Sequence, residues 1–196
     1  MAEFRSELDV EVEGGEGPGL AARQVGAWLL RALREIAETL IPAVLIALVI
    51  NLFLAQATQV LGQSMEPTLH NTDRVVVEKV TYNLLHGPRR GDVVVLDLPS
   101  QPELLIKRVI GLAGETIEIR GGEVFIDGER LVEEWTVRLG GGSYGPVEVP
   151  PLHVFVLGDN RGASNDSRAF GPVPIDDIVG RAWFSYWPLE HMGFVE

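Results

Sequence analysis

One uninterrupted apolar stretch, residues 40–57, limits most strongly what this chain can fold into. No charged residue lies between Glu38 and Glu66, and residues 41–55 are apolar on every helical face except at Asn51. At about 1.5 Å per residue, a helix of this length reaches across a bilayer core of roughly 30 Å. We therefore predict a transmembrane helix over residues 39–58, with Pro42 in its first turn, where a missing amide hydrogen costs least.

Two other interpretations of this stretch compete with a membrane anchor. Ala55-Gln56-Ala57 has the small-x-small form of a signal-peptide cleavage site, but the region before the apolar core would then be about 40 residues long and acidic, unlike that of a signal peptide. A buried helix of a soluble domain is less compatible with a segment that is apolar all round. The anchor explains both the length and the pattern.

The flanks of the stretch indicate its orientation. Residues 1–19 are acidic and then rich in glycine and proline, so they predict a disordered cytoplasmic tail. Residues 20–38 have an apolar stripe at helical spacing, which predicts an amphipathic juxtamembrane helix. Arg23, Arg31 and Arg34 precede the span, and the next basic residue after it is Arg74. By the positive-inside rule, the N-terminus is cytoplasmic and residues 59–196 form an extracytoplasmic domain on the cell membrane.

Beyond the span the apolar pattern changes to the period of two that is typical of β-strands. Short β-branched runs occur at residues 74–79, 92–96, 104–110, 116–119, 123–126 and 154–157. Gly121-Gly122 predicts a tight hairpin, and Asp127-Gly128 predicts the next turn. Residues 140–145 are read as a glycine-rich, solvated connection. The expected fold class is mostly β, an antiparallel β-sheet domain with one N-terminal transmembrane helix.

Composition excludes several classes of function. A formal net charge of −12 argues against a nucleic-acid partner, because phosphate binding needs a concentrated positive face. The chain has no cysteine, which removes disulfides, thiolate nucleophiles and zinc sites built on sulfur. With 196 residues, the chain has room for one globular domain and an appendage.

Ser64 follows the apolar stretch directly and is a candidate nucleophile. A serine hydroxyl needs a nearby base, and the surrounding residues do not form the G-x-S-x-G elbow, because Glu66 replaces the last glycine. Read alone, residues 64–68 could equally form a turn that leaves the membrane. The histidines stand in loops with no second motif to place them, and we read them as solvated or locally hydrogen-bonded: His70, His86, His153 and His191.

Lys107 is the alternative base. It lies on a predicted strand whose two faces are both apolar, and burial would lower its pKa from about 10.4, the direction that a general base requires. By itself, a lysine on a strand more often reaches out to solvent. Loop 158–172 does not meet the D-x-[DN]-x-[DN]-G rule of a calcium loop, and read alone it is a polar structural turn.

Together these segments resemble the type I signal peptidases, which are membrane-anchored serine proteases. The resemblance rests on four ordered motifs: GQSMEPTL at residues 62–69, RGDVV at 90–94, IKRVIGLAGE at 106–115, and GDNR at 158–161, followed by Ser164, Asp166-Ser167-Arg168, Phe170-Gly171 and Val173. It implies a fold like that of signal peptidases and repressor-type proteases. It also implies removal of N-terminal signal peptides from exported preproteins.

The same resemblance implies roles for individual residues. Ser64 would be the nucleophile and Lys107 the general base, and the backbone amide of Ser64 would be one oxyanion donor. Ser164 would hydrogen-bond the lysine ammonium, and Asp166 and Arg168 would brace its loop. Some relatives have a serine two positions before the nucleophile as the second oxyanion donor. Gly62 stands there, so the second donor stays open.

Substrate choice follows from the resemblance as well. Family substrates have small residues, typically alanine, at the first and third positions before the cut. The implied substrate-binding positions are Gly62, Met65, Leu69 and Ile106, and the implied partners are preproteins and the lipid bilayer, with no metal or cofactor. Oligomeric state is not indicated. C-terminal aromatics fit a membrane-facing surface or a core equally well: Trp183, Phe184, Tyr186 and Trp187.

Two rival functions remain beside this one. A self-cleaving serine–lysine protease of the repressor type shares the chemistry, but it would have a DNA-binding helix-turn-helix in place of the membrane span. A catalytically silent, membrane-tethered module that binds signal peptides or translocation partners is the second rival. The presence of both Ser64 and Lys107 favours the enzyme over it.

Overall fold

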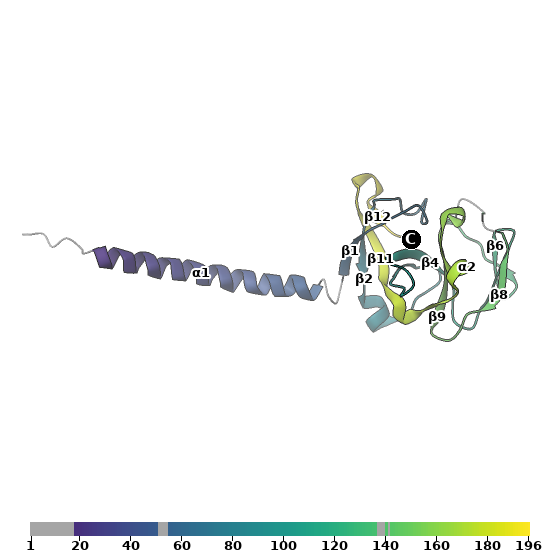
Figure 1. Ribbon diagram of the computed structural model, residues 1–196, viewed down its shortest axis with the longest axis horizontal. Coiled ribbons are helices and arrows are strands. Elements are labelled where there is room, and N and C mark those ends of the chain that lie inside the picture. Colours follow the sequence, from purple (N-terminus) through teal and green to yellow (C-terminus); the bar gives the residue numbers. More distant parts are fainter. Residues whose placement is uncertain (1–17, 51–54, 137–139, 141) are drawn as a thin grey trace, which may run out of the picture. The chain divides into compact units, whose positions relative to one another are not determined.

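The computed structural model describes residues 18–50, 55–136, 140 and 142–196. The chain divides into two compact units, Met1–Ala47 and Leu48–Glu196, and each is described by itself. Helix α1 (Pro18–Val49) accounts for the described part of the first unit. The second unit contains the β-strands and short helices (Figure 1).

Helix α1 differs from the expected two-part arrangement. Residues 18–49 form one continuous helix, so no break separates the segment expected to be amphipathic from the expected span, and Pro42 lies inside the helix rather than in a first turn. Pro18 and Gly19, assigned to the disordered tail, are helical, and residues 1–17 of that tail lie outside the described residues. Alanine and leucine, which have high helix propensity, fill much of the segment and favour one continuous helix.

The end of the predicted span also differs. Residues 55–58 were expected to be helical, but β1 (Ala55–Gln59) pairs with the strand Arg74–Glu78, so that Ala57 lies opposite Val76. The backbone N–H and C=O groups of these residues therefore bond to a neighbouring strand, where a longer helix would have bonded them within itself. In the part of the chain that the structure describes, no helix has both the length and the apolarity needed to span a membrane.

The larger sheet has eight strands and is antiparallel throughout its described pairs (Figure 1). Its order is β1-β2-β11-β3-β4-β9-β10, and β12 also pairs with β11. The strand bounds are β2 Arg74–Glu78, β3 Val93–Leu96, β4 Leu105–Gly111, β9 His153–Leu157, β10 Val173–Pro174, β11 Ile178–Trp187 and β12 Gly193–Phe194. Central β4 therefore has β3 on one side and β9 on the other.

A second, four-stranded sheet has the order β7-β6-β5-β8. Its strands are β5 Thr116–Arg120, β6 Glu123–Ile126, β7 Glu129–Arg130 and β8 Tyr144–Glu148. Gly121 and Gly122 both have positive φ, of 58° and 89°, as a two-residue hairpin turn between right-twisted strands requires. The predicted hairpin is confirmed, as is the next turn, which joins β6 to β7 through Asp127 and Gly128.

Short helices connect the strands. They are the single π-helical turn η2 Thr81–Leu85, the 3₁₀ turns η3 Arg161–Ala163, η4 Ile175–Asp177 and η5 Leu189–His191, and the four-residue helix α2 Ser167–Phe170. Two of them, η3 and α2, belong to the polar loop that the sequence singled out after residue 157.

The six strands predicted from β-branched runs are confirmed, and so is the mostly β, antiparallel class. The sequence reading missed β11, the longest strand, which lies between β2 and β3. Register shifts occur within β11 against both neighbours, between Ile178 and Gly180, between Ala182 and Phe184, and between Ser185 and Trp187. Each shift interrupts the period-two alternation by which a strand is recognised.

The glycine-rich segment at residues 140–145 is only partly a loop, which corrects the expectation of a solvated connection. Tyr144 and Gly145 begin β8, which pairs with β5. Gly145 has φ of 83°, and a Cβ there would lie 2.5 Å from the carbonyl oxygen of Ile117. Close approach of two strands, rather than flexibility, explains the glycine at this position.

The core of the second unit lies around the central strands. All residues of β3 are buried, and every residue of β4 after Leu105 is buried too. Valine, isoleucine and leucine dominate three adjoining clusters, and each fully buried side chain of this kind contributes about 1.5–3 kcal/mol. The two charged residues of β4, Lys107 and Arg108, therefore lie in the interior of this unit.

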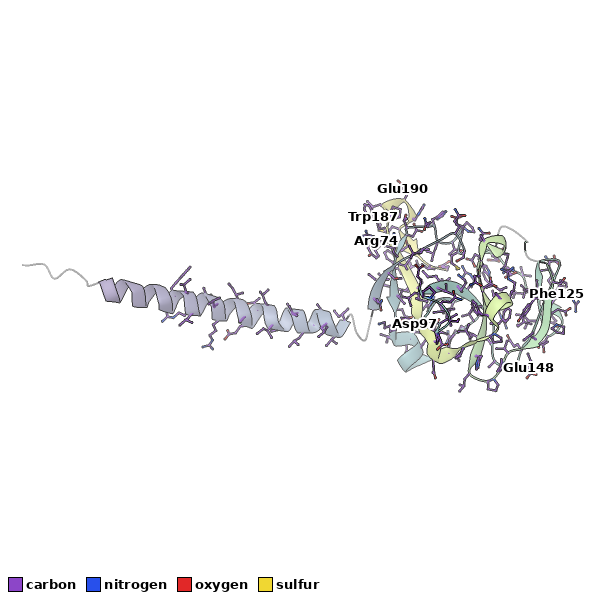
Figure 2. The ribbon with its side chains drawn as sticks, in the orientation of Figure 1. Arg74, Asp97, Phe125, Glu148, Trp187 and Glu190 are labelled. Atoms are coloured by element: carbon purple, nitrogen blue, oxygen red, sulfur yellow. The ribbon has the colours of Figure 1, made fainter. Side chains whose placement is uncertain are left out.

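The C-terminal aromatic residues do not form a core. Trp183 and Trp187 are 46% and 52% exposed, while Phe184 and Tyr186 are half-buried. Trp183 packs against Phe194, with ring centroids 5.4 Å apart. Trp187 lies near Arg74, its register partner on β2 (Figure 2). The two tryptophans therefore lie at the surface rather than in the core, and the membrane-facing role of this region stays a prediction.

Candidate active site

Lys107 lies in the middle of β4 and is 3% exposed. Its register partner on β3 is Val94, and its ammonium group stays within the protein. The Nζ atom donates hydrogen bonds to Ser64 Oγ at 2.9 Å and to the Ile106 carbonyl oxygen at 2.8 Å. The candidate base and the candidate nucleophile, 43 positions apart in sequence, are in direct contact.

Burial sets the protonation of this lysine. Desolvation lowers the pKa of Lys107 from 10.5 to about 8, and the negative charges of Asp166 and Asp159 partly oppose the shift. About a tenth of molecules are then neutral at Lys107 at pH 7, compared with about 0.03% for an unperturbed lysine. A neutral amine beside a hydroxyl is the arrangement that a general base needs.

Ser64 lies in a compact turn between β1 and β2. Within this turn the Leu69 amide donates to the Met65 carbonyl oxygen at 2.9 Å. The Ser64 carbonyl oxygen accepts a hydrogen bond from the Asn160 amide at 3.0 Å, which ties the turn to the polar loop after β9. Two contacts therefore position Ser64, one from Asn160 to its carbonyl oxygen and one from Lys107 to its side-chain hydroxyl.

Gly62 has φ of 86°, in the left-handed region that favours glycine. Its amide donates to Asn71 Oδ1 at 2.9 Å. That hydrogen bond fixes the entry to the Ser64 turn. It also occupies the Gly62 amide, which is therefore not a spare donor for a developing oxyanion.

The polar loop after β9 packs tightly on the Ser64 turn. A Cβ on Gly158 would lie 2.5 Å from the Ser64 carbonyl oxygen and would collide with Ser164 Oγ. Such approaches do not occur for real side chains, so only glycine fits. Ser164 Oγ is buried and close enough to Asp166 to help lower the pKa of that carboxyl, although no contact of standard hydrogen-bond geometry reaches it within the described part of the chain. The two donor contacts of Lys107 go to Ser64 and Ile106 instead.

Asp166 and Arg168 form a buried ion pair in this loop. Arg168 donates to Asp166 Oδ1 and Oδ2 at 2.8 Å each, and the Gly158 amide donates to Oδ2 at 3.1 Å. Asp166 also caps α2 by accepting from the Arg168 amide. Burial by itself would raise the pKa of Asp166, but these hydrogen bonds outweigh it and hold the pKa below its usual value.

A second buried ion pair, which sequence reasoning left without a role, joins Arg108 to Asp159. Arg108 is 1% exposed and donates to the two carboxylate oxygens at 2.8 and 2.7 Å. Further bonds reach the Gly91 and Glu196 carbonyl oxygens and Thr68 Oγ1. The sequence did contain a signal for this pair. Arg108 lies next to Lys107 on a strand predicted to be buried, and a buried arginine requires a carboxylate partner.

The three apolar residues expected to contact substrate lie together. Met65 and Leu69 are each 1% exposed, Ile106 is 7% exposed, and all belong to one core cluster. Ile106 is also the residue whose carbonyl oxygen accepts from Lys107. Met65 follows Ser64 and Ile106 precedes Lys107 in the chain, and little of the surface of these apolar residues faces outward.

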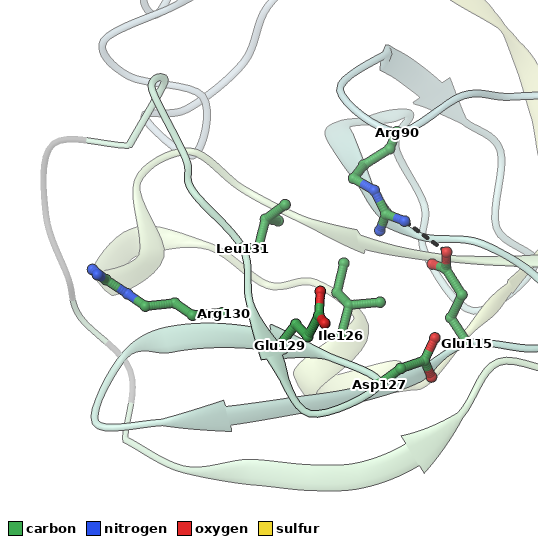
Figure 3. Close-up of a pocket in the computed structure, with 7 residues that line it drawn as sticks. All are labelled: Arg90, Glu115, Ile126, Asp127, Glu129, Arg130 and Leu131. Atoms are coloured by element: carbon green, nitrogen blue, oxygen red, sulfur yellow. Dashed lines mark hydrogen bonds and ion pairs between the residues drawn. The ribbon is translucent and has the colours of Figure 1, made fainter.

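Two cavities lie near these elements. One of about 510 Å³ is lined by Pro67, Thr68, Gly91, Arg108, Glu134, Trp135 and Glu196. The other, of about 340 Å³, contains the ion pair between Arg90 and Glu115 at 2.6 Å (dashed in Figure 3). Its other lining residues are Ile126, Asp127, Glu129, Arg130 and Leu131, none of which belongs to the candidate active site.

Two of the four histidines behave as expected. His86 Nδ1 bonds the Gly87 carbonyl oxygen at 2.7 Å, and His153 Nδ1 bonds the Pro151 carbonyl oxygen at 2.9 Å. Both contacts are local and exposed. His70 and His191 instead approach each other across the fold and are treated below.

The geometry therefore fits nucleophilic hydrolysis by serine with lysine as the base, and comparison with known proteins agrees. Residues 33–187 match the model of the family described as signal peptidase, peptidase S26. Signal peptidase I of Leptolyngbya laminosa is 41% identical over 169 residues, covering 82% of this chain and 83% of the relative. Signal peptidase I T of Bacillus subtilis is 37% identical over 169 residues, covering 81% and 87%.

A crystal structure of a signal peptidase I from Enterococcus faecalis V583 is 32% identical, with a TM-score of 0.42, and covers 48% of this chain and 95% of that one. The family match spans more than half of the chain, and the curated relatives match most of their own length as well. The chain therefore belongs to the signal peptidase family, peptidase S26.

Proposed function

We propose that this peptidase removes N-terminal signal peptides from exported preproteins, with Ser64 as the nucleophile and Lys107 as the general base. The observation that carries the assignment is the 2.9 Å hydrogen bond between Lys107 Nζ and Ser64 Oγ inside an apolar enclosure. Hydrogen-bond reach and a pKa near the working pH are the two requirements of a base, and Lys107 meets both.

The reaction proceeds in two halves. Neutral Lys107 takes the proton of Ser64 as Oγ attacks the scissile carbonyl carbon, and the resulting ammonium then protonates the leaving amine. Water next attacks the acyl-enzyme, with Lys107 again accepting a proton, and Ser64 Oγ regains one when the product acid leaves. The Ser64 amide supplies one oxyanion donor. The negative charges of Asp159 and Asp166 favour the ammonium that forms.

The polar loop positions these groups. Asp166 and Arg168 hold α2 and the Gly158 amide, and Gly158 in turn packs on the Ser64 carbonyl oxygen. Ser164 Oγ is buried beside Gly158, the same residue that approaches the Ser64 carbonyl oxygen. We assign Ser164 to orienting the ammonium once it forms, when three donors rather than two must be satisfied.

Substrate specificity follows from shallow apolar pockets that exclude large side chains. The cleavage rule we propose is small-x-small, with alanine preferred at both small positions. Gly62, Met65, Leu69 and Ile106 are the positions we assign to these pockets, and the three apolar side chains among them belong to one buried cluster.

We further propose that the enzyme acts on a membrane. The apolar residues that begin at Leu40 serve as a single-pass anchor with a cytoplasmic N-terminus, placing the peptidase unit outside the cytoplasm of the cell membrane. Exposed apolar side chains along α1 and the exposed Trp183 and Trp187 support this assignment. Retention in the membrane pellet after alkaline carbonate extraction tests the anchor, and release into the supernatant contradicts it.

The test of catalysis is cleavage of a purified precursor with an Ala-x-Ala site. We expect the wild-type chain to process it, and Ser64→Ala to leave it intact. Ser100→Ala, which alters an exposed serine outside the site, is the matched control and should cleave normally. Equal processing by Ser64→Ala would refute the nucleophile. Intact precursor with every variant, wild type included, would favour a silent signal-peptide binding module.

A further inference from the structure

Two histidines and one aspartate meet in the peptidase unit at a place that the proposed chemistry does not use. His191 Nδ1 lies 2.8 Å from Asp73 Oδ1, and His70 Nδ1 lies 3.8 Å from Asp73 Oδ2. The two imidazole rings stack with centroids 4.3 Å apart. One candidate ligand atom from each residue can be chosen so that all lie within 4.8 Å of one another.

The carboxylate of this cluster is buried. Asp73 is 1% exposed, and it accepts the His70 amide at 2.8 Å in addition to its contacts with the two rings. Among the described residues, no lysine or arginine forms an ion pair with it. A buried carboxylate is costly unless a cation accompanies it, and here only the imidazoles are in place to bring one.

We propose that His70, Asp73 and His191 form a binding site for a divalent first-row transition metal, with Zn²⁺ the best match. Two imidazole nitrogens and one carboxylate oxygen are ligands that suit zinc, whereas Ca²⁺ and Mg²⁺ require mostly oxygen. The metal would replace the direct contact between His191 Nδ1 and Asp73 Oδ1. Both rings are partly exposed, so water can fill the remaining coordination position.

The adjustment needed to close the site is small. Zinc holds nitrogen and oxygen ligands at about 2.0–2.2 Å, which keeps neighbouring ligand atoms roughly 3.4 Å apart. Atoms now up to 4.8 Å apart therefore have to approach by about 1.4 Å. Rotation of the His70 and His191 rings, which are 45% and 36% exposed as side chains, supplies this movement while buried Asp73 stays fixed.

The site would clip together two distant parts of the chain. His70 and Asp73 follow the Ser64 turn, whereas His191 belongs to η5, after β11, 118 positions from Asp73. Figure 2 shows Arg74 and Glu190, the chain neighbours of Asp73 and His191, at the same end of the sheet. A link across so long a loop restricts the unfolded chain strongly, so bound metal should raise the unfolding temperature.

The experiment uses the untagged full-length chain in detergent, with ZnCl₂ as the probe. We expect one Zn²⁺ per chain by titration calorimetry, and a Tm increase of about 5 °C at a hundredfold excess over Kd. MgCl₂ and CaCl₂ should leave Tm unchanged. The variants His70→Asn and His191→Asn should each lose most of the zinc-induced increase, while His86→Asn and His153→Asn, outside the cluster, should keep it.

Three results would overturn the site. They are no binding of Zn²⁺ by the wild-type chain, an equal Tm increase in His70→Asn, and an equal effect of Mg²⁺. His70 has the weaker contact with Asp73, so His70→Asn keeps the 2.8 Å bond to His191 and the metal-free fold. Zinc-edge X-ray absorption on the wild type should report two imidazole ligands, and a spectrum with none would contradict the proposal without any variant.

Discussion

Lys107 and Arg108 are neighbours on β4, and both are buried. Their side chains nevertheless have different hydrogen-bond partners. Arg108 meets a carboxylate in bidentate geometry, and further oxygens satisfy its remaining donors. Lys107 meets one hydroxyl and one carbonyl oxygen. The carboxylate therefore compensates the buried guanidinium, whereas burial lowers the pKa of the Lys107 amine to about 8. Burial beside a paired carboxylate is compatible with a charged side chain, whereas burial without such a pair lowers the pKa of a lysine amine.

Replacing the amine should have the largest effect. Lys107→Met is expected to lower kcat/KM by about 10⁴-fold or more, because the serine loses its base. Stability should nevertheless rise. Relief of the depressed pKa is worth about 3 kcal/mol at pH 7, and the Ile106 carbonyl oxygen, left without its donor, costs about 1–2 kcal/mol. Urea unfolding should show a net gain of about 1–2 kcal/mol.

Lys79→Met is the matched control for this variant, since Lys79 is the other lysine of the chain and is half-exposed. It should alter neither cleavage nor stability beyond a few tenths of a kcal/mol. A Lys107→Met protein that cleaves precursor, or that unfolds at lower urea concentration than wild type, would break the comparison.

Removing the charge of the neighbour should act on stability instead. Arg108→Met leaves the carboxylate of Asp159 buried without its cation, and about 3–5 kcal/mol of unfolding free energy should be lost. The double variant Arg108→Met/Asp159→Leu should recover most of that loss. If the double variant is as unstable as Arg108→Met, the loss of unfolding free energy does not come from leaving Asp159 unpaired. Arg120→Met, which breaks an exposed pair with Glu118, should give no measurable change.

The smallest effect is the response to pH. Below about 8, kcat/KM on a signal-peptide substrate should fall about tenfold per pH unit as Lys107 becomes protonated, to about a hundredfold below its plateau at pH 6. The unfolded lysine binds a proton up to about 10.5, so stability should rise as pH increases from about 8 to 10.5. A flat rate from pH 6 to 9 would contradict a neutral-lysine base.

The sequence was sufficient for strands whose alternation is regular. β3, β4 and the β5–β6 hairpin follow from β-branched runs and paired glycines, because local preference and burial point the same way there. β11 was missed because its register shifts break the period, and because Gly180 interrupts it. That glycine is required, since a Cβ would collide with the Glu78 carbonyl oxygen on β2, a constraint visible only after pairing.

The site was less accessible to sequence reasoning. The apolar flanks of Lys107 predicted the direction of its pKa change, but its contact with Ser64 depends on a turn and a strand that meet only in the fold. The roles of both residues came from the family resemblance. The contact between Asp73 and His191 could not be predicted from the sequence either, because no local pattern indicates a partner 118 positions away.

Gly158 has a consequence for engineering this enzyme. The loop that contains it reads as pliable, yet a methyl group at this position would strike Ser164 Oγ and the Ser64 carbonyl oxygen. Four positions along, Gly162 has no neighbour of its added carbon closer than 3.9 Å. In a saturation library, the enzyme should therefore tolerate many replacements at Gly162 and none at Gly158. Substitutions meant to rigidify the loop should be made at Gly162, and Gly158 should be kept.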